Sequence, residues 1–278
     1  MRKTSKPFML VLALALAVSL GACGGTSSQP AASSAGTENN PSQASSQAAP
    51  ADPTEKKDAY VVGISQLVTH PALDAATEGF QDALNKWLPG QVTFDYQNAA
   101  NDPATCATIA NSFVSKNVDL IMANATSALQ AAATATADIP ILGTSVTEYG
   151  VAFGITDFSG TVGGNISGTS DLAPLDQQAA MIKEWCPDAK NVGLVYCSNE
   201  ANSQYQVDTV QGYLQDMGYT CTQYAFSDSN DIAAVCQTAA DNSDVLYIPT
   251  DNSAAANKGN IDNICRGNIP VFCGEEGI

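Results

Sequence analysis

The sequence predicts an α/β fold made of two similar lobes with a ligand cleft between them. An apolar strand, a polar loop, an Ala-rich helix start and an Ile-Pro strand follow one another twice, over residues 118–142 and 245–272. Strands that alternate with helices imply parallel sheets. In open sheets of this kind, ligands bind outside the carboxyl ends of the strands. The polar loops of the two repeats therefore predict a cleft lined from both sides.

The chain begins with the pattern of an export signal. Basic residues precede an apolar run over residues 9–20, which is shorter than the roughly 20 residues that a membrane-spanning helix needs. The run ends in Leu20-Gly21-Ala22-Cys23, which resembles a bacterial lipobox. By this resemblance, residues 1–22 are removed and Cys23 carries a lipid anchor on the extracytoplasmic face of the cell membrane. The alternative is an ordinary cysteine behind a signal peptide.

The lipidated cysteine and a flexible linker are expected to occupy residues 23–58. After Cys23 the segment consists mainly of Ser, Ala, Gln, Pro, Thr and Asn, with almost no large apolar side chain. Such a composition cannot bury enough surface to offset the entropy lost on ordering. We therefore expect a tether that holds the folded part away from the membrane.

The first lobe is expected over residues 59–171. Pro71 suits the first turn of a helix, and Asp102 followed by Pro103 has the pattern of an N-cap with proline at the first helical position. The segment 165–171 is expected to be a crossover strand. The other predicted strands are 60–64, 92–96, 118–123 and 139–142, and the predicted helices are 71–88, 103–116 and one from residue 127.

The second lobe is expected over residues 172–278. A helix begins at Pro174 and ends near residue 186, and the strand–helix alternation then starts again. The predicted strands are 192–196, 219–224, 244–248 and 269–272, and the predicted helices are 201–217, 230–240 and 254–266.

The charge of the chain argues against a nucleic-acid partner. Three of the eleven Lys and Arg precede Cys23, whereas all 28 Asp and Glu follow it, so 8 basic residues face 28 acidic ones from Cys23 onward. Nucleic-acid binding rests on Lys and Arg that neutralise phosphates. Such an acidic balance instead suits a solvated, exported protein.

The cysteines do not indicate a metal site. Seven of the eight follow Cys23, none forms a Cys-x-x-Cys motif, and the chain has a single histidine. We therefore expect no metal and no cofactor. Cys221 with Cys236, or Cys265 with Cys273, are candidate disulfides, and buried free thiols are the equal alternative.

Small polar residues follow nearly every predicted strand, and their joint placement in both lobes favours a binding role over turn and capping roles alone. The candidate ligand-binding residues are Ser65, Gln66, His70, Thr126, Ser127 and Ser145 in the first lobe and Glu200, Asn202, Thr250, Asp251, Asn252 and Glu276 in the second.

Motifs that would indicate an enzyme do not occur. The sequence contains no Gly-x-Ser-x-Gly elbow, no P-loop and no Gly-x-Gly-x-x-Gly motif, and any Ser–His or Cys–His pair would have to use His70. Carboxylate-pair chemistry by Asp251 and Glu276 is the remaining enzymatic alternative. The sequence thus favours binding over catalysis.

Several sequence runs are characteristic. They include Val62-Gly63-Ile64-Ser65-Gln66, His70-Pro71-Ala72-Leu73-Asp74, Asp95-Tyr96-Gln97-Asn98-Ala99 and Tyr247-Ile248-Pro249-Thr250-Asp251-Asn252. These runs resemble the ABC transporter substrate-binding proteins of the TrpX type, and the resemblance extends from about residue 60 to the end. It implies a type I periplasmic-binding-protein fold with two Rossmann-like lobes, an amino acid-like ligand (aromatic in part of the family), and permease and ATPase partners for a monomeric receptor.

The sequence departs from that family pattern in two places. Cys197-Ser198-Asn199 stands where the family usually has Asn-Pro-Ser. Family members also continue beyond the position of Ile278 with a segment that returns to the first lobe. We therefore expect the second lobe to stop before that return, which would leave an unpaired strand edge and an apolar surface in the first lobe and make the protein poorly soluble.

For an amino acid ligand, the residue types suggest specific roles. The lobes contain one arginine, Arg266, on a predicted helix away from the strand ends, so Thr126 and Ser127 at a helix start are expected to bind the carboxylate, supported by Ser65 and Ser145. Asp251 is the first choice for the ammonium group, with Glu276 or Glu200 second. His70 and Asn202 would close the cleft.

Three other functions remain as alternatives to an amino acid receptor. They are a sensor or surface interaction domain of the same fold, a sugar- or nucleoside-binding protein, and a hydrolase.

Overall fold

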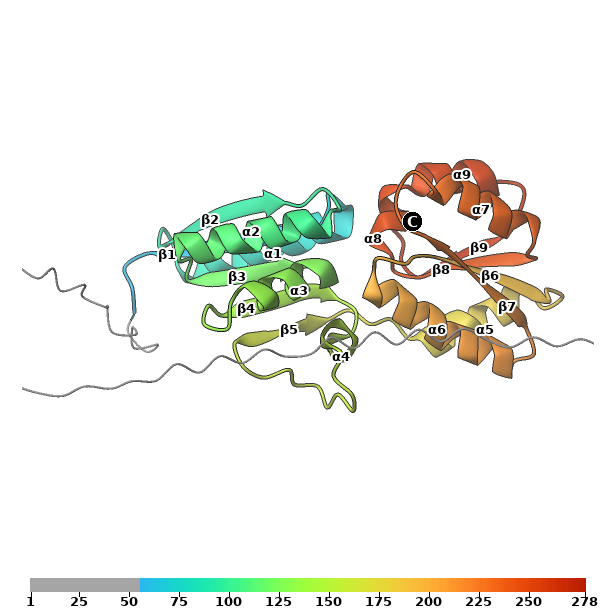
Figure 1. The fold of residues 1–278 in the computed structure, drawn as a ribbon, viewed down its shortest axis with the longest axis horizontal. Coiled ribbons are helices and arrows are strands. Elements are labelled where there is room, and N and C mark those ends of the chain that lie inside the picture. The colour runs from blue at the N-terminus through green and yellow to red at the C-terminus, as the bar shows by residue number, and fades with distance from the viewer. Residues whose placement is uncertain (1–55) are drawn as a thin grey trace, which may run out of the picture. The chain divides into compact units, whose positions relative to one another are not determined.

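The computed structural model describes residues 56–278, which form two lobes, each built on one sheet (Figure 1). The expectations for the export signal, for Cys23 and for most of the linker concern residues 1–55 and lie outside the described residues. Over residues 56–278, no helix has both the length and the apolar character that crossing a membrane requires.

The first lobe contains a five-stranded parallel sheet in the order β2-β1-β3-β4-β5. The strand order reverses between β1 and β3, and such a switch point is where open α/β sheets bind ligands. The elements are β1 (Tyr60–Gln66), α1 (Pro71–Trp87), β2 (Val92–Asn98), α2 (Pro103–Lys116), β3 (Leu120–Asn124), α3 (Thr126–Ala135), β4 (Ile141–Val146), α4 (Tyr149–Phe153) and β5 (Ile166–Ser170).

The second lobe repeats the arrangement with a four-stranded parallel sheet in the order β7-β6-β8-β9. Its order reverses between β6 and β8, so the switch point is again beside the first strand. The elements are α5 (Leu175–Trp185), β6 (Asn191–Cys197), α6 (Ala201–Asp216), β7 (Thr220–Phe226), α7 (Ile232–Asp241), β8 (Val245–Ile248), α8 (Asn252–Ala256), α9 (Lys258–Cys265) and β9 (Val271–Cys273).

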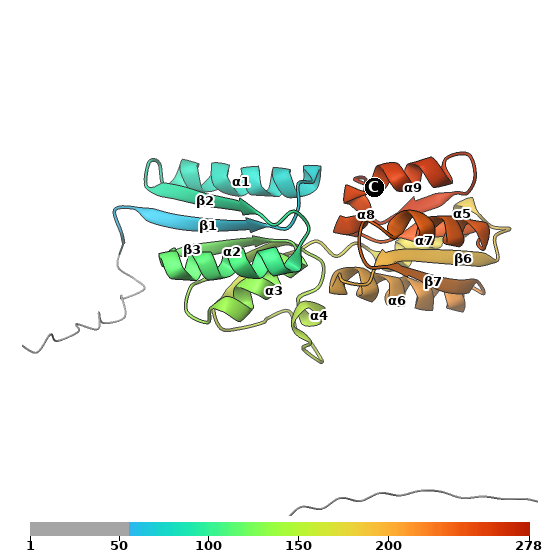
Figure 2. The same cartoon turned by 45° about the horizontal axis from the view of Figure 1, so that its top comes forward.

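Helices cover both faces of the first sheet, and Figure 2 shows α1 and α2 on opposite sides of it. Val62 and Ile64 of β1 pack towards Phe80 of α1, whereas Phe113 of α2 is fully buried in the core on the other face. Gly63 lies between these two layers, and a Cβ atom there would be 2.7 Å from the Phe113 ring. A glycine at this strand position therefore lets α2 approach the sheet closely.

The second sheet is also covered on both faces. Along β6, Leu194 belongs to the core under α5 and α6, and its neighbour Val195 belongs to the core under α7 and α9. This alternation follows from the two-residue period of a strand, which directs successive side chains to opposite faces. Both are fully buried, which explains why the strand reads as a continuous apolar run.

The helices α1 and α2 each have a side-chain N-cap, and Asp102 is the one that the sequence indicated. The Asp102 carboxylate accepts hydrogen bonds from the backbone N–H groups of Ala104 at 3.0 Å and Thr105 at 3.1 Å, and Pro103 is the first residue of α2. His70 caps α1 in the same way through Nδ1, with Pro71 next. Each cap satisfies an N–H group that lacks a partner inside the helix.

The structure differs from the predicted elements in three places. The predicted helix 254–266 consists of two helices in the structure. Asp251 caps the first of them, α8, and the helix is interrupted at Asn257, whose side-chain amide donates to the Ser253 carbonyl at 2.8 Å. The short helix α4 lies in the Gly-, Ser- and Thr-rich region, where composition does not indicate a helix. The segment predicted as a crossover strand becomes β5, an edge strand of the first sheet.

Candidate functional site

The loop after β1 is held by the Gln66 side chain. Its amide donates to the Val68 carbonyl at 2.8 Å and to the Asp74 carboxylate at 2.6 Å, and its oxygen accepts from the Thr77 hydroxyl at 2.7 Å. Gln66 is fully buried. Its hydrogen-bonding groups are therefore engaged inside the first lobe, where they position the segment that leads to His70.

His70 lies at the start of α1, where one ring nitrogen accepts a hydrogen bond and the other has no hydrogen-bond partner among the described residues. Nδ1 accepts from the Ala72 N–H at 3.3 Å, so the proton of the neutral ring is on Nε2. Nε2 is buried and has no hydrogen-bond partner among the described residues. Burial, and then the positive charge of Lys258, lower the pKa of His70, so the ring is neutral near pH 7 and offers an N–H donor.

The helix α3 begins without a side-chain cap. Ala125, the residue before it, has φ +92° and forms no capping hydrogen bond, and Thr126 and Ser127 are both buried at this helix start. The first N–H groups of a helix need an external partner, and a helix N-terminus favours an anion. This arrangement suits the predicted carboxylate role of these two residues. Ser65, at the end of β1, also has a buried hydroxyl without a partner.

In the second lobe, the Glu200 carboxylate holds the loop after β8. It accepts from the backbone and side-chain N–H groups of Asn252 at 3.1 and 2.7 Å, and from the backbone N–H and hydroxyl of Ser253 at 2.8 and 2.7 Å. Asn202 also donates to it at 3.2 Å. These contacts join the loop after β6 to the loop after β8, the two sides of the switch point.

Asp251, the first choice for the ammonium group, makes its hydrogen bonds inside the second lobe. Its side chain is fully buried, and its carboxylate accepts from the backbone N–H groups of Cys197 and Ala254, both at 2.7 Å. Burial, and then the negative charge of Glu200, raise the pKa of Asp251. In this structure Asp251 caps α8 and ties β6 to it, so the residue ranked first for the ammonium group serves as a structural cap here.

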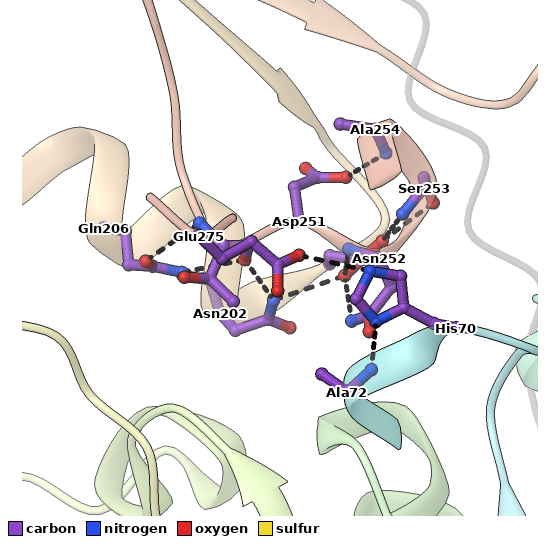
Figure 3. A network of polar contacts seen from close by, with 11 residues as sticks. His70, Ala72, Asn202, Gln206, Asp251, Asn252, Ser253, Ala254 and Glu275 are labelled. Atoms are coloured by element: carbon purple, nitrogen blue, oxygen red, sulfur yellow. Dashed lines mark hydrogen bonds and ion pairs between the residues drawn. The ribbon is translucent and has the colours of Figure 1, made fainter. Parts of the chain in front are cut away.

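Glu275, which stands next to the candidate Glu276 after the last predicted strand, faces the first lobe. Its Oε1 lies 3.8 Å from His70 Nε2, and Figure 3 shows the two side chains facing each other. Burial raises the pKa of Glu275, and so do the negative charges of Asp171, Glu200 and Glu276, with Lys258 opposing them. The next residue, Glu276, is exposed. A half-buried carboxylate among like charges is stabilised by a cation.

Loops from both lobes line one cavity of about 260 Å³. Ser127 contributes from the first lobe, and Glu200 and Ser253 from the second. Beside it, the Asn101 amide donates to the Ser253 hydroxyl across the two lobes at 2.9 Å. Cavities of this size, close to the lower end of the usual range for small-molecule sites, suit a small ligand.

The remaining candidate residues have different surroundings. Asn202 is buried, and its side-chain oxygen has no partner among the described residues. The Gln206 side chain binds the Thr250 backbone twice, because it accepts from the Thr250 N–H at 3.2 Å and donates to the Thr250 carbonyl at 3.0 Å.

Two further residues lie outside the shared cavity. Ser145 has φ +53° beside an irregularity in the β4–β5 pairing, and it does not line the cavity. Arg266 pairs with Asp262 on the exposed side of α9.

These contacts place open polar groups at the strand ends of both lobes: a helix start without a side-chain cap, a carboxylate among like charges, and buried hydroxyl, imidazole and amide groups without partners among the described residues. Of these residues, Ser127 lines the shared cavity, whereas Ser65, His70, Asn202 and Glu275 lie outside its lining. Because a buried polar atom without a partner is costly, such open groups mark a place where a ligand completes the bonding. Two α/β lobes, each built on a parallel sheet and carrying such groups at its strand ends, are typical of a solute-binding protein with the type I periplasmic-binding fold.

The chain belongs to the ABC transporter substrate binding protein family, whose model matches residues 61–278. This result confirms the resemblance and the fold class that the sequence indicated. Among characterised relatives, the chain is 38% identical over 245 residues to a tyrosine-binding protein of Clostridioides difficile strain R20291, a match that covers 87% of this chain and 70% of that protein.

Solved structures of substrate-binding proteins also resemble this chain. An ABC domain from Streptococcus pneumonia in complex with L-Trp is 30% identical, with a TM-score of 0.74, covering 79% of this chain and 75% of that one. A ligand-free, open substrate binding protein with adhesive properties from Clostridium difficile is 39% identical, with a TM-score of 0.55, covering 78% and 75%.

Proposed function

We propose that this protein is an extracytoplasmic solute-binding lipoprotein of an ABC importer. It binds an amino acid-like ligand, preferably tyrosine or tryptophan, between its two lobes and delivers it to a permease. The names of two relatives support the aromatic class, since one is called tyrosine-binding and another was solved with L-Trp.

The observation that carries this proposal is the set of buried polar atoms without partners at the strand ends of both lobes. Ser65 Oγ, His70 Nε2 and Asn124 Oδ1 are such atoms in the first lobe, and Asn202 Oδ1 is one in the second. Three of the four belong to candidate residues from the sequence, and Asn124, at the end of β3, was not among them. An amino acid ligand carries donors and acceptors that can bind them.

The charges of the site suggest how an amino acid would be oriented. We assign the ligand carboxylate to the start of α3, where Thr126 and Ser127 supply hydroxyl and N–H donors. We assign the ammonium group to Glu275, whose raised pKa reflects burial and the nearby charges of Asp171 and Glu200. This choice replaces Asp251, because both of its oxygens already accept backbone hydrogen bonds.

A thermal-shift screen of the protein against the twenty amino acids, sugars and nucleosides tests the proposal. A ligand that binds only the native state raises the melting temperature in proportion to its saturation. We expect tyrosine or tryptophan to give the largest shift and calorimetric titration to show one site. A shift with sugars or nucleosides alone would contradict the ligand class, and turnover of the ligand would contradict a pure binding role.

A second candidate is a role in surface interaction, either alongside transport or instead of it. It is favoured by the 39% identity to a substrate binding protein described as having adhesive properties. Binding of the labelled protein to epithelial cell layers, compared with a charge-matched exported protein, measures this role. Uptake of labelled tyrosine by cells with and without the gene measures import, so the two roles can be separated.

A further inference from the structure

Two cysteines of the second lobe are in contact, and neither belongs to the candidate ligand site. Cys236 of α7 and Cys265 at the end of α9 have sulfur atoms 3.7 Å apart. Both are buried, in the core that α7 and α9 share beneath the sheet. Neither pair considered from the sequence, Cys221 with Cys236 or Cys265 with Cys273, is the pair that this contact joins.

The geometry of the contact favours a covalent bond between the two sulfurs. A disulfide has its sulfurs about 2 Å apart, a distance that a small side-chain rotation reaches from a van der Waals contact. The two cysteines lie on neighbouring helices, which Figure 1 shows side by side. The contact with Cys236 lowers the pKa of Cys265, against burial and the charge of Asp262, which favours Cys265 as the attacking thiolate.

We propose that Cys236 and Cys265 form a disulfide that links α7 to α9 when the protein folds in the presence of an oxidised low-molecular-weight disulfide such as oxidised glutathione, before the core closes over the two thiols. The Cys265 thiolate attacks one glutathione sulfur, which forms a mixed disulfide and releases one reduced glutathione. The Cys236 thiolate then attacks the Cys265 sulfur and releases the second. Both cysteines are oxidised, oxidised glutathione is reduced, and the two protons end on the released thiols.

The bond would stabilise the lobe by restricting the unfolded chain. It closes a loop over residues 236–265, and the stabilisation that a disulfide gives grows with the length of the loop it closes. For a loop of this length in a protein of this size, we expect the melting temperature to rise by about 10 °C. The proposed disulfide does not involve the ligand site, so its test does not depend on ligand binding.

Peptide mapping of the wild-type protein tests the proposal directly and needs no variant. The protein is refolded with oxidised glutathione, alkylated in denaturant without reductant, and cut by trypsin at Lys190, Lys258 and Arg266. We expect peptides 191–258 and 259–266 to be joined, with fragmentation locating the bond at Cys236. Alkylation of both cysteines, or a bond at Cys197 or Cys221 instead, would overturn the proposal.

Melting temperatures with and without reductant provide the second readout. We expect reduction to lower the melting temperature of the oxidised wild type by about 10 °C. The double variant Cys236→Ala/Cys265→Ala should show no response to reductant, whereas Cys106→Ala, a buried cysteine of the first lobe, should respond like the wild type. An oxidised wild type that melts at the same temperature as the reduced protein would argue against a stabilising linkage.

Discussion

At the scale of single residues, the acidic side chains near the strand ends have separate roles that their positions in the chain do not reveal. Glu200 fixes a loop through several hydrogen bonds, and Asp251 caps a helix from a fully buried position. Glu275 faces His70, whereas its neighbour Glu276 is exposed. Only Glu275 combines partial exposure, a raised pKa and contact with the opposite lobe, so the proposed ammonium contact depends on it.

Replacing Glu275 by Gln should weaken the binding of an amino acid ligand by about 10- to 100-fold. A hydrogen bond to a charged group contributes about 1.5–3 kcal/mol, and each 1.4 kcal/mol corresponds to a factor of ten in affinity. Calorimetric titration with tyrosine measures the effect. Glu276→Gln, which makes the same change at the adjacent exposed position, should leave affinity nearly unchanged. Equal affinities for the two variants would rule out Glu275 as the ammonium partner.

The raised pKa of Glu275 also predicts a pH dependence of binding. Below this pKa the carboxyl is neutral and attracts no ammonium group; above it the carboxylate is charged. Affinity should therefore rise as the pH increases from about 4.5, the ordinary value, through the raised pKa, and then level off. His70 adds no opposing change above pH 6.5, since its pKa is lowered. Titrations across this range should lose the slope in Glu275→Gln, and a slope that persists there would assign it to another group.

At the scale of elements, side chains hold the loops that follow the strands. Glu200 joins the loops after β6 and β8 in the second lobe, and Gln66 joins the loop after β1 to α1 in the first. Such contacts keep the strand ends of each switch point in a defined arrangement before a ligand arrives. Preorganisation of this kind reduces the ordering cost of binding.

Glu200→Ala should lower the free energy of unfolding by about 2 kcal/mol or more. The substitution leaves buried donors of Asn252 and Ser253 without an acceptor, and each such group costs about 1–3 kcal/mol. Urea denaturation measures the change. The matched variant Glu184→Ala removes an exposed carboxylate of α5 and should stay within about 0.5 kcal/mol of the wild type. A similar small effect for Glu200→Ala would contradict the loop-fixing role.

Gly63→Ala should destabilise the first lobe by about 1–3 kcal/mol, because the new methyl group meets the Phe113 ring. Gly79→Ala is the matched control: nothing lies within 4 Å of a Cβ atom there, and alanine suits the interior of α1, so stability should rise by about 0.5–1 kcal/mol. Combining Gly63→Ala with Phe113→Leu should cost less than the sum of the single changes. Strict additivity would show that the two positions are not in contact.

At the scale of the whole molecule, the proposed function requires an anchor in addition to the two lobes. Cys23→Ala should abolish labelling of the protein by radioactive palmitate in cells, because Cys23 is the cysteine that directly follows Leu20-Gly21-Ala22 in the lipobox-like run. Cys106→Ala, which alters a buried cysteine of the folded part, should retain the label. Labelling that persists in Cys23→Ala would refute the anchor without affecting the fold or the ligand site.

Much of the fold could be predicted from local patterns, because strand runs, helix starts and proline positions depend on neighbouring residues. The cap of α2 by Asp102 is an example. The break between α8 and α9 could not be predicted in this way, since it depends on the contacts of Asp251 and Asn257 within the folded lobe. In the site, strand-end position pointed to Ser127, to Glu200 and to the Glu275-Glu276 pair, but it could not show which carboxylate of that pair faces His70.

The sequence by itself determined the α/β alternation, the repeat of a polar loop after each apolar strand, and the family to which the chain belongs. These are properties of short segments, and physical preferences for strands, helices and caps act at that range. Only the tertiary structure decided which carboxylate faces the other lobe and that Cys236 lies against Cys265. Both depend on how side chains distant in the chain pack, because burial and orientation arise only when the sheets and helices are assembled.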